Sequence, residues 1–150
     1  MRLYILRHGK AKEGSPDALR ELKKKGREDI QFVLEKRLNE LQTIQQIQSS
    51  ALVRAEQTAI LAKDVLQLDL DITENMHLTP WAKPMEFLRT IDEEKGDLLI
   101  TSHQPFVSDL ITVLTGQDLW MPTSSLVCLE AEYMAPQTAS VIWQQNPEGK

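Results

Sequence analysis

Arg2-Leu-Tyr-Ile-Leu-Arg-His-Gly9 is a short β-rich run that stops abruptly at Arg7, His8 and Gly9. Such a run, bounded by polar residues and glycine, predicts a strand that passes into a loop. In α/β proteins, functional side chains lie beyond the carboxyl ends of the strands. Arg7 and His8 are therefore the first candidate functional residues.

Outward from this strand, segments with helical and β-like patterns alternate along the chain. Helices are expected over about 19–41, 55–66, 84–95 and 105–116. Gly26 interrupts the first helix at a cost of about 1 kcal/mol relative to Ala. Strands are expected over about 44–49, 69–73 and 98–100, followed by a hairpin over about 125–132 and 139–143. This alternation predicts an α/β fold, a three-layer sandwich in which helices flank a mostly parallel central sheet.

Composition limits the class of protein. A chain of 150 residues with 41% hydrophobic and 26% charged residues is typical of a globular protein, so one domain over residues 1–150 is expected. The net charge of −5 disfavours nucleic acid as a partner. A single cysteine, Cys128, and the lack of a long apolar segment favour a cytoplasmic protein without membrane association.

Four side chains carry the chemistry that the sequence indicates. They are Arg7 and His8 after the first strand, Arg54 at the start of the second helix, and His103 after the strand at 98–100. Phosphoryl transfer requires positive charge around the peripheral oxygens and a nucleophile in line with the leaving group. Two arginines and two histidines meet this requirement without a metal or another cofactor.

The segments that hold these residues resemble the histidine phosphatase superfamily, whose fold is phosphoglycerate mutase-like. They are Leu6-Arg-His-Gly9, Ser49-Ser-Ala-Leu-Val-Arg-Ala-Glu-Gln-Thr-Ala59 and Ser102-His-Gln-Pro105. Within the superfamily the chain most resembles the SixA-type phosphohistidine phosphatases. That likeness rests on Leu78-Thr-Pro80, Pro122-Thr-Ser-Ser125 and Trp143-Gln with Pro147.

The resemblance implies that His8 attacks phosphorus and becomes a phosphohistidine intermediate. Arg7, Arg54 and His103 would then bind the phosphoryl oxygens, and Arg20 resembles a further arginine near the phosphate. Neighbouring guanidinium groups disfavour a charged imidazole, which suits a histidine nucleophile. The family pattern Leu-Thr-x-x-Gly reads Leu22-Lys-Lys-Lys-Gly26 here, so a threonine N-cap is lost and the helix entry is expected to differ.

Simpler interpretations exist for several of these residues. Arg54 could form a structural salt bridge with Glu56 or Asp64. A zinc site made of His8, His103 and Cys128 is conceivable, although no paired ligand spacing supports it. His77 is expected to be structural, and the basic cluster of Lys23–Lys25 with Arg27 is expected to be a solvated helix face.

The region after the third strand bears on the substrate. Superfamily members that act on alcohol esters usually carry a carboxylic acid there, whereas residues 76–84 contain none, and only Glu74 and Glu86 could replace it. An alkoxide needs an acid in order to leave, but imidazole, with a pKa near 6.5, leaves readily as the neutral ring. A missing acid therefore favours a P–N bond over a P–O ester.

Short connections predict an open site that accepts a side chain of another protein. The expected enzyme is a phosphohistidine phosphatase in signal transduction, monomeric, acting on a phosphotransfer domain or a sugar-transport phosphocarrier. Two alternatives stay open. One is a small-molecule phosphatase or mutase of the phosphoglycerate type, and the other is a non-catalytic phosphohistidine-binding module.

Overall fold

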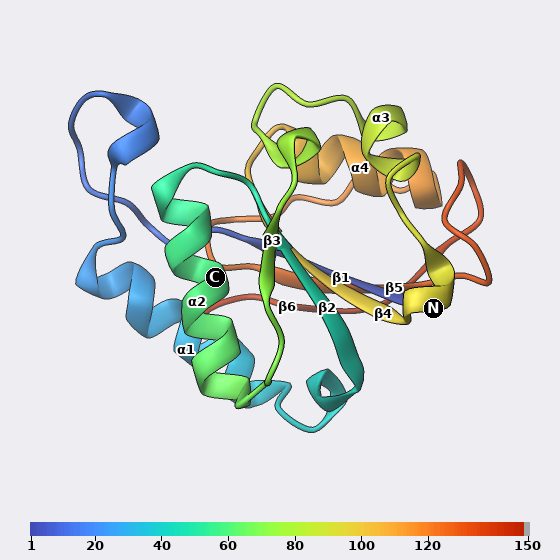
Figure 1. The fold of residues 1–150 in the computed structure, drawn as a ribbon, viewed down its shortest axis with the longest axis horizontal. Helices are drawn as coiled ribbons and strands as arrows, with labels where there is room; N and C mark the ends of the chain where they lie inside the picture. Colours follow the sequence, from blue (N-terminus) through green and yellow to red (C-terminus); the bar gives the residue numbers. More distant parts are fainter. Residues whose placement is uncertain (149–150) are drawn as a thin grey trace.

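A computed structural model describes residues 1–148, which form a six-stranded sheet of order β3-β2-β4-β1-β5-β6 (Figure 1). The strands are β1 (Arg2–Arg7), β2 (Ile44–Ser49), β3 (Ile72–Glu74), β4 (Asp97–Ser102), β5 (Leu126–Glu130) and β6 (Ser140–Gln145). The β3-β2, β2-β4 and β4-β1 pairs are parallel, and β5 runs antiparallel to both β1 and β6. The expected mostly parallel sheet with a final hairpin is confirmed.

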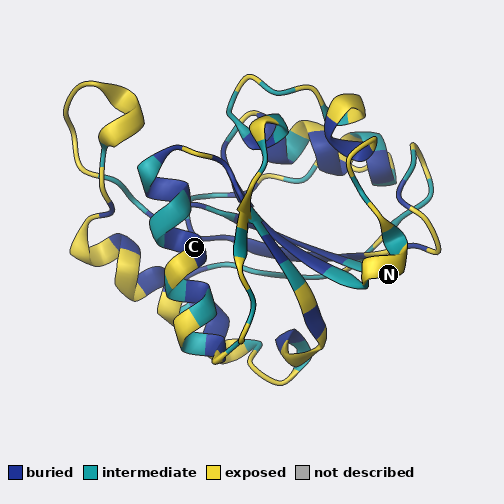
Figure 2. Ribbon diagram, viewed as in Figure 1, coloured by how far each residue is buried: buried dark blue, intermediate teal, exposed yellow. Residues whose placement is uncertain are grey.

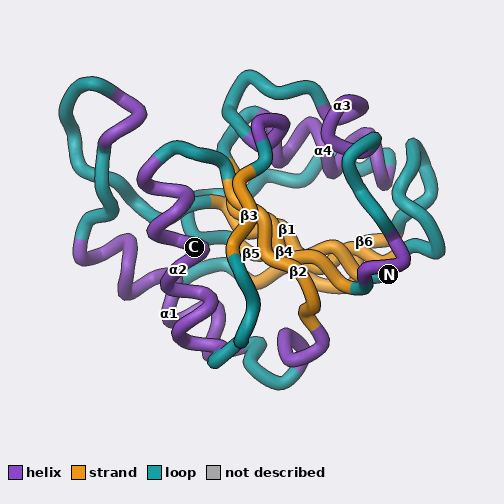
Figure 3. Tube along the Cα trace, viewed as in Figure 1, coloured by secondary structure: helices purple, strands orange, loops and turns teal. Residues whose placement is uncertain are grey.

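Helices cover both faces of the sheet, so the fold has three layers, as expected (Figure 3). On one face lie α1 (Lys24–Lys36) and α2 (Val53–Leu66), and on the other lie α3 (Pro84–Leu88) and α4 (Phe106–Thr115). Short 3-10 turns connect them: η1 (Asp17–Leu19), η2 (Glu40–Thr43), η3 (Met76–Leu78) and η4 (Glu93–Lys95). Within residues 1–148, no helix combines the length and the apolar character needed to cross a membrane.

The central strand β1 explains why the first residues are so apolar. Leu3 and Ile5 belong to the core beneath α4, whereas Tyr4 and Leu6 belong to the core beneath α1 and α2. A strand covered on both faces must present apolar side chains at successive positions. Figure 2 shows the middle of this strand buried, with many of the exposed residues on the outer surfaces of the helices and in the loops.

The first helix begins five residues later than the sequence pattern predicts. Its N-cap is Lys23, which makes no side-chain capping hydrogen bond, in agreement with the lost threonine. The preceding residue, Leu22, instead forms an antiparallel bridge with Ala11. Tertiary pairing of this segment with the loop after β1 therefore prevailed over its helical apolar spacing.

Other element boundaries were also predicted wrongly. The first helix ends at Lys36 and not at residue 41, because residues 40–43 form the separate turn η2. The third helix ends at Leu88 instead of reaching Lys95. The Thr90 hydroxyl donates a hydrogen bond to the Phe87 carbonyl, and residues 93–95 form a separate turn capped by Asp92. The third strand covers Ile72–Glu74 and not 69–73, since its position is set by pairing with β2. By contrast, α4 follows Pro105 and ends at Gly116 with a positive φ of 75°, as expected.

Candidate active site

The four candidate residues meet at the carboxyl ends of β1 and β4, beside the start of α2. Arg7 is in register with Ser102 at the end of β4, and the His8 N–H donates to the Ser102 carbonyl at 3.0 Å. The centres of the His8 and His103 rings are 5.0 Å apart. Parallel pairing of two strands thus brings together residues that are about a hundred positions apart in the sequence.

A polar network connects His8 to the helix that carries Arg54. The Gly9 N–H donates to Thr58 Oγ1 at 3.3 Å, and the Thr58 hydroxyl donates to the Arg54 carbonyl at 2.7 Å. Gly9 also packs against Gly26 of α1, where a Cβ at position 9 would lie 2.8 Å from the Gly26 carbonyl oxygen. The loop after β1 is therefore held between α1 and α2.

His8 is buried and in a tautomer suited to nucleophilic attack. Its Nδ1 lies 2.7 Å from the Gly9 carbonyl oxygen, and because a carbonyl only accepts, Nδ1 must carry the hydrogen. The lone pair of the neutral ring is then on Nε2. Burial, followed by the charges of Arg54, Arg7 and Arg20, lowers the pKa of His8 to about 4. The ring is therefore neutral at pH 7.

His103 is held in the complementary tautomer. Its Nε2 lies 2.6 Å from Ser50 Oγ, and that hydroxyl oxygen also accepts from the Leu52 N–H at 3.1 Å. We assign the Ser50 hydroxyl as the donor to Nε2, which leaves the hydrogen of the neutral ring on Nδ1. Burial, with the charges of His8 and Arg54, lowers the pKa of His103 to about 2. Nδ1–H is then a neutral donor.

Both arginines present a buried N–H that no protein group accepts. Arg7 donates through Nη1 to the Met121 carbonyl at 3.0 Å, and Arg54 donates through Nη1 and Nη2 to Asp17. In the described part of the chain, five buried side-chain polar atoms lack a partner, and three are Arg7 Nε, Arg54 Nε and His103 Nδ1. Buried donors are normally paired, so three such atoms in one place indicate a site for an anion.

Asp17 is a contributor that sequence reasoning missed. Its backbone carbonyl and its Oδ2 accept from Arg54 at 3.1 and 3.2 Å, and its Oδ1 accepts from Arg20 Nε at 2.9 Å. The hydrogen bond from Arg20 lowers the pKa of the Asp17 carboxyl, with a further contribution from the charge of Arg54. The carboxylate thus bridges two arginines. Its spacing three residues before Arg20 was the available signal.

The alternative in which Arg54 pairs with Glu56 or Asp64 is wrong, since its carboxylate partner is Asp17. Arg20 lies at the edge of the same cluster and also donates through Nη1 to the Lys12 carbonyl at 3.0 Å. The basic residues Lys23–Lys25 and Arg27 are exposed, as expected. The arginines whose charges act on His8 are Arg54, Arg7 and Arg20, and Asp17 bridges the first and the last of them.

Glu74 and Glu86 are engaged with other groups. Glu86 Oε2 lies 3.5 Å from His77 Nδ1, and the Glu74 carboxyl acts on that of Glu56. Burial, with a further contribution from Glu74, raises the pKa of Glu56. The charged side chains that lower the pKa of His8 are all arginines. Neither Glu74 nor Glu86 is thus among the groups that act on the proposed nucleophile.

The residues of the conceivable zinc site do not come together. Cys128 is buried in the middle of the sheet opposite Tyr4, and burial raises the pKa of its thiol to about 11. Across residues 1–148, no group of three or more His, Cys, Asp or Glu side chains is arranged to hold a metal ion. Nothing in this arrangement assigns Cys128 a role in the site.

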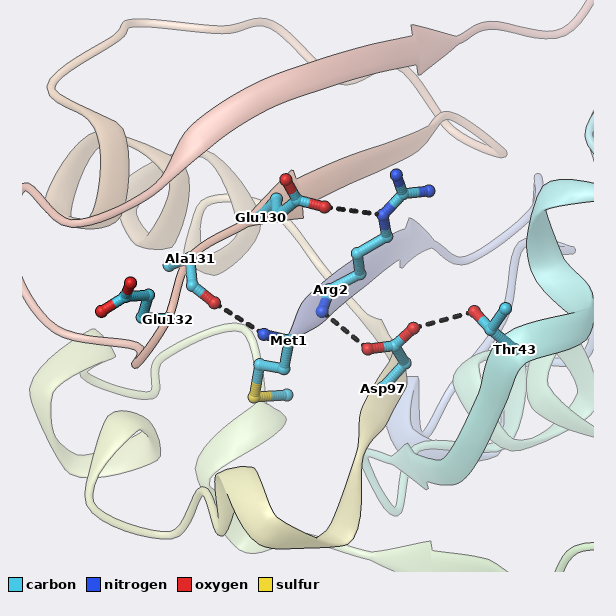
Figure 4. Close-up of a pocket in the computed structure, with 7 residues that line it drawn as sticks. All are labelled: Met1, Arg2, Thr43, Asp97, Glu130, Ala131 and Glu132. Carbon is cyan, nitrogen blue, oxygen red and sulfur yellow. Dashed lines mark hydrogen bonds and ion pairs between the residues drawn. The ribbon is translucent and has the colours of Figure 1, made fainter.

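A cavity of about 470 Å³ lies at the opposite end of the sheet, around the amino end of β1 (Figure 4). Its polar groups pair with one another: Arg2 Nε donates to Glu130 at 2.9 Å, and Asp97 accepts from the Arg2 N–H and the Thr43 hydroxyl. The amino terminus donates to the Ala131 carbonyl. These contacts hold the strand ends together. The buried donors without a partner, Arg7 Nε and His103 Nδ1 among them, lie at the other end of β1.

The sequence of the first half of the chain matches a known family. Residues 3–79, just over half of the chain, match the sequence model of the histidine phosphatase superfamily, branch 1. The chain belongs to this superfamily. No curated protein sequence matches this histidine phosphatase.

Solved structures of phosphatases have a fold similar to that of this chain. A structure of the protein histidine phosphatase SixA complexed with tungstate aligns with a TM-score of 0.86 and 24% identity, over 98% of this chain and 97% of that one. A putative SixA from Agrobacterium tumefaciens gives 0.82 and 22% over 97% of each chain, and the alpha-ribazole phosphatase from Shigella flexneri gives 0.75 and 19% over 94% of each. Both phosphohistidine and small-molecule phosphatases are thus similar in fold to this superfamily member.

Proposed function

We propose that this histidine phosphatase hydrolyses phosphohistidine on another protein, with His8 as the nucleophile. The observation that carries the proposal is a neutral His8, with its lone pair on Nε2, beside three buried N–H groups that lack an acceptor. Donors placed in advance around developing negative charge are a main source of rate enhancement. The same geometry supports the roles of Arg7, Arg54 and His103 as phosphoryl ligands.

In the first step, His8 Nε2 forms a bond to phosphorus while the P–N bond of the substrate breaks. A substrate ring that carries a hydrogen on its other nitrogen leaves as neutral imidazole and takes the electron pair of the broken bond. Phospho-His8 becomes cationic, because Nδ1 keeps its hydrogen, and the Gly9 carbonyl at 2.7 Å stabilises that charge. Leaving group and nucleophile are the same chemical group, so no strong acid is required.

In the second step, water attacks phosphorus and the bond to His8 Nε2 breaks. The ring recovers its lone pair, phosphate leaves, and the proton of the water passes to the phosphate or to solvent. Arg7, Arg54 and His103 donate to the phosphoryl oxygens through both steps. Each side chain is held in place by a hydrogen bond through another of its atoms, with Met121 for Arg7, Asp17 for Arg54 and Ser50 for His103.

Two observations favour a P–N bond on a protein over an alcohol ester. Glu86 pairs with His77, neither Glu74 nor Glu86 is among the groups that shift the pKa of His8, and Asp17 is held as the carboxylate by two arginines. None of the three is therefore suited to protonate an alkoxide. The connection from Gly9 to α1 contains one short turn, η1, and forms no lid domain. The partner we propose is a phosphotransfer domain or a phosphocarrier, with this chain acting as a monomer in the cytoplasm.

The experiment is hydrolysis of a histidine-phosphorylated phosphotransfer protein by wild type, His8→Ala and the matched control His77→Ala. A phosphoserine peptide is assayed alongside. We expect wild type and H77A to act on the phosphohistidine only, and H8A to lose more than about 10³-fold in kcat, as is usual when a nucleophile is removed. Circular dichroism reports whether H8A is folded.

The other results are equally informative. Folded H8A with near-normal turnover would exclude His8 as the nucleophile. Hydrolysis chiefly of the phosphoserine peptide would favour a small-molecule phosphatase with an acid elsewhere, and binding without turnover in wild type would favour a phosphohistidine-binding module. Alkaline quenching followed by mass spectrometry detects phospho-His8 directly.

A further inference from the structure

Trp120 is an exposed aromatic residue directly beside the candidate active site. Trp120 is 69% exposed, and the guanidinium carbon of Arg7 lies 5.8 Å from the centre of the Trp120 ring. Trp120 and Arg7 also line one cavity of about 390 Å³, together with Pro122, Thr123 and Asn146. The cavity therefore adjoins the group that we propose as a phosphoryl ligand.

Hydrogen bonds from three different elements hold the backbone around Trp120 in place. The carbonyls of Leu119, Trp120 and Met121 accept hydrogen bonds in succession. The donors are the Ser108 hydroxyl of α4 at 3.0 Å, the Gln144 amide of β6 at 2.9 Å and the Arg7 guanidinium at 3.0 Å. An exposed indole on a backbone held in this way differs from the scattered apolar residues found on most surfaces. It is a preformed flat contact surface.

We propose that Trp120 and this cavity form a subsite for the imidazole ring of the substrate phosphohistidine. The inference rests on the proposed function and extends it to the leaving group. In an in-line displacement the leaving nitrogen lies on the far side of phosphorus from His8 Nε2, and so towards the open side of the site. The cavity shares Arg7 with the phosphoryl ligands, which places it next to that position.

The chemistry of the subsite matches a protonated imidazole ring. An indole face attracts a flat cationic ring through both stacking and its quadrupole. Thr123 adds a polar side chain to the lining, where a ring N–H requires an acceptor, whereas the side-chain oxygen of Asn146 already accepts from Ser125 and Gln144. An alkyl phosphate offers neither a ring nor a charge to this surface, so the subsite would discriminate between the two substrate classes.

The test compares two small P–N compounds, N-phosphoimidazole, which has the ring, and phosphoramidate, which has none. The measured quantity is the ratio of kcat/KM on phosphoimidazole to kcat/KM on phosphoramidate. We expect Trp120→Ala and Trp120→Leu to lower this ratio about fivefold to tenfold, the size of an aromatic contact, and Trp120→Phe to recover most of it. The leucine variant keeps apolar volume and so separates loss of the ring from loss of packing.

Tyr133→Ala is the matched control, because Tyr133 is an exposed aromatic residue between β5 and β6, at the opposite end of the sheet. Its ratio should equal that of wild type. An unchanged ratio in W120A and W120L, with an active wild type, would overturn the subsite and leave the proposed function standing. A wild type inactive on both P–N compounds but active on alkyl phosphates would overturn the proposed function and the subsite with it.

Discussion

Asp17 joins two arginines of the candidate active site. It accepts from Nη1 and Nη2 at the end of the Arg54 guanidinium, and from Nε of Arg20. Arg54 Nε remains buried and without an acceptor. The contact therefore leaves Arg54 Nε without a protein acceptor, and we infer that Asp17 positions Arg54 for the proposed phosphoryl group.

We predict that Asp17→Asn lowers kcat/KM about tenfold, chiefly through a higher KM, since charge-assisted hydrogen bonds to both arginines are weakened. The inhibition constant for inorganic phosphate should rise with it. Glu13→Gln in the same exposed loop is the control and should behave as wild type. Tighter inhibition by phosphate in D17N would mean that Asp17 competes with the substrate for Arg54, in contradiction to the positioning role.

Packing of α1 against the loop after β1 depends on two glycines. Gly9 faces Gly26, and a Cβ at position 26 would lie 2.3 Å from the Lys10 carbonyl oxygen and 2.8 Å from its nitrogen. Lys10 follows the Arg7-His8-Gly9 segment directly, so a side chain at position 26 would displace the loop that holds the proposed nucleophile. The glycine that appears from the sequence to weaken a helix is required by this close approach.

We predict that Gly26→Ala lowers the free energy of unfolding by about 1–3 kcal/mol, the usual cost of overpacking. At an exposed helical position the same substitution would stabilise the protein by up to about 1 kcal/mol. Urea denaturation of G26A measures the sign directly. Gln31→Ala, at an exposed position of the same helix, should change stability by less than about 0.5 kcal/mol. A more stable G26A would show that the loop can move without cost.

The stability of the whole molecule is linked to its two buried neutral histidines. Their pKa values are lowered by burial to about 4 for His8 and about 2 for His103, from an ordinary value of 6.5. Between pH 6.5 and pH 4 the unfolded chain binds protons at these positions and the folded protein does not. Stability is therefore full above pH 6.5 and falls as the pH decreases from 6.5 towards 4.

We predict a loss of about 1.4 kcal/mol per pH unit for each histidine in that range. Urea denaturation of wild type at pH 7, 6 and 5 measures the slope, and His103→Gln, which removes one of the two titrating rings, should have a shallower slope than wild type. Equal wild-type stability at pH 7 and pH 5 would contradict the neutral, buried state of both rings. The proposed nucleophile would then be charged in weak acid.

From the sequence alone, the alternation of elements, the parallel core of the sheet and the placement of Arg7, His8, Arg54 and His103 at element ends could be predicted. These features depend on local patterns. A strand covered on both faces, such as β1, must be apolar at its buried positions, here Leu3 to Leu6, and Pro105 and Gly116 bound α4 through their own backbone preferences. That residues 1–150 form one domain, and that the four residues are catalytic, stay predictions.

Only the tertiary structure decided the start of α1, the partner of Arg54, the tautomers of the two histidines and the position of Trp120 beside Arg7. Each depends on contacts between segments far apart in the chain: Leu22 with Ala11, Asp17 with Arg54, and Ser50 with His103. Local propensity differs by about 1 kcal/mol or less between most residues, so pairing and burial across the fold override it. The sequence therefore determined which groups reach the sheet edge, and packing determined how each one is oriented there.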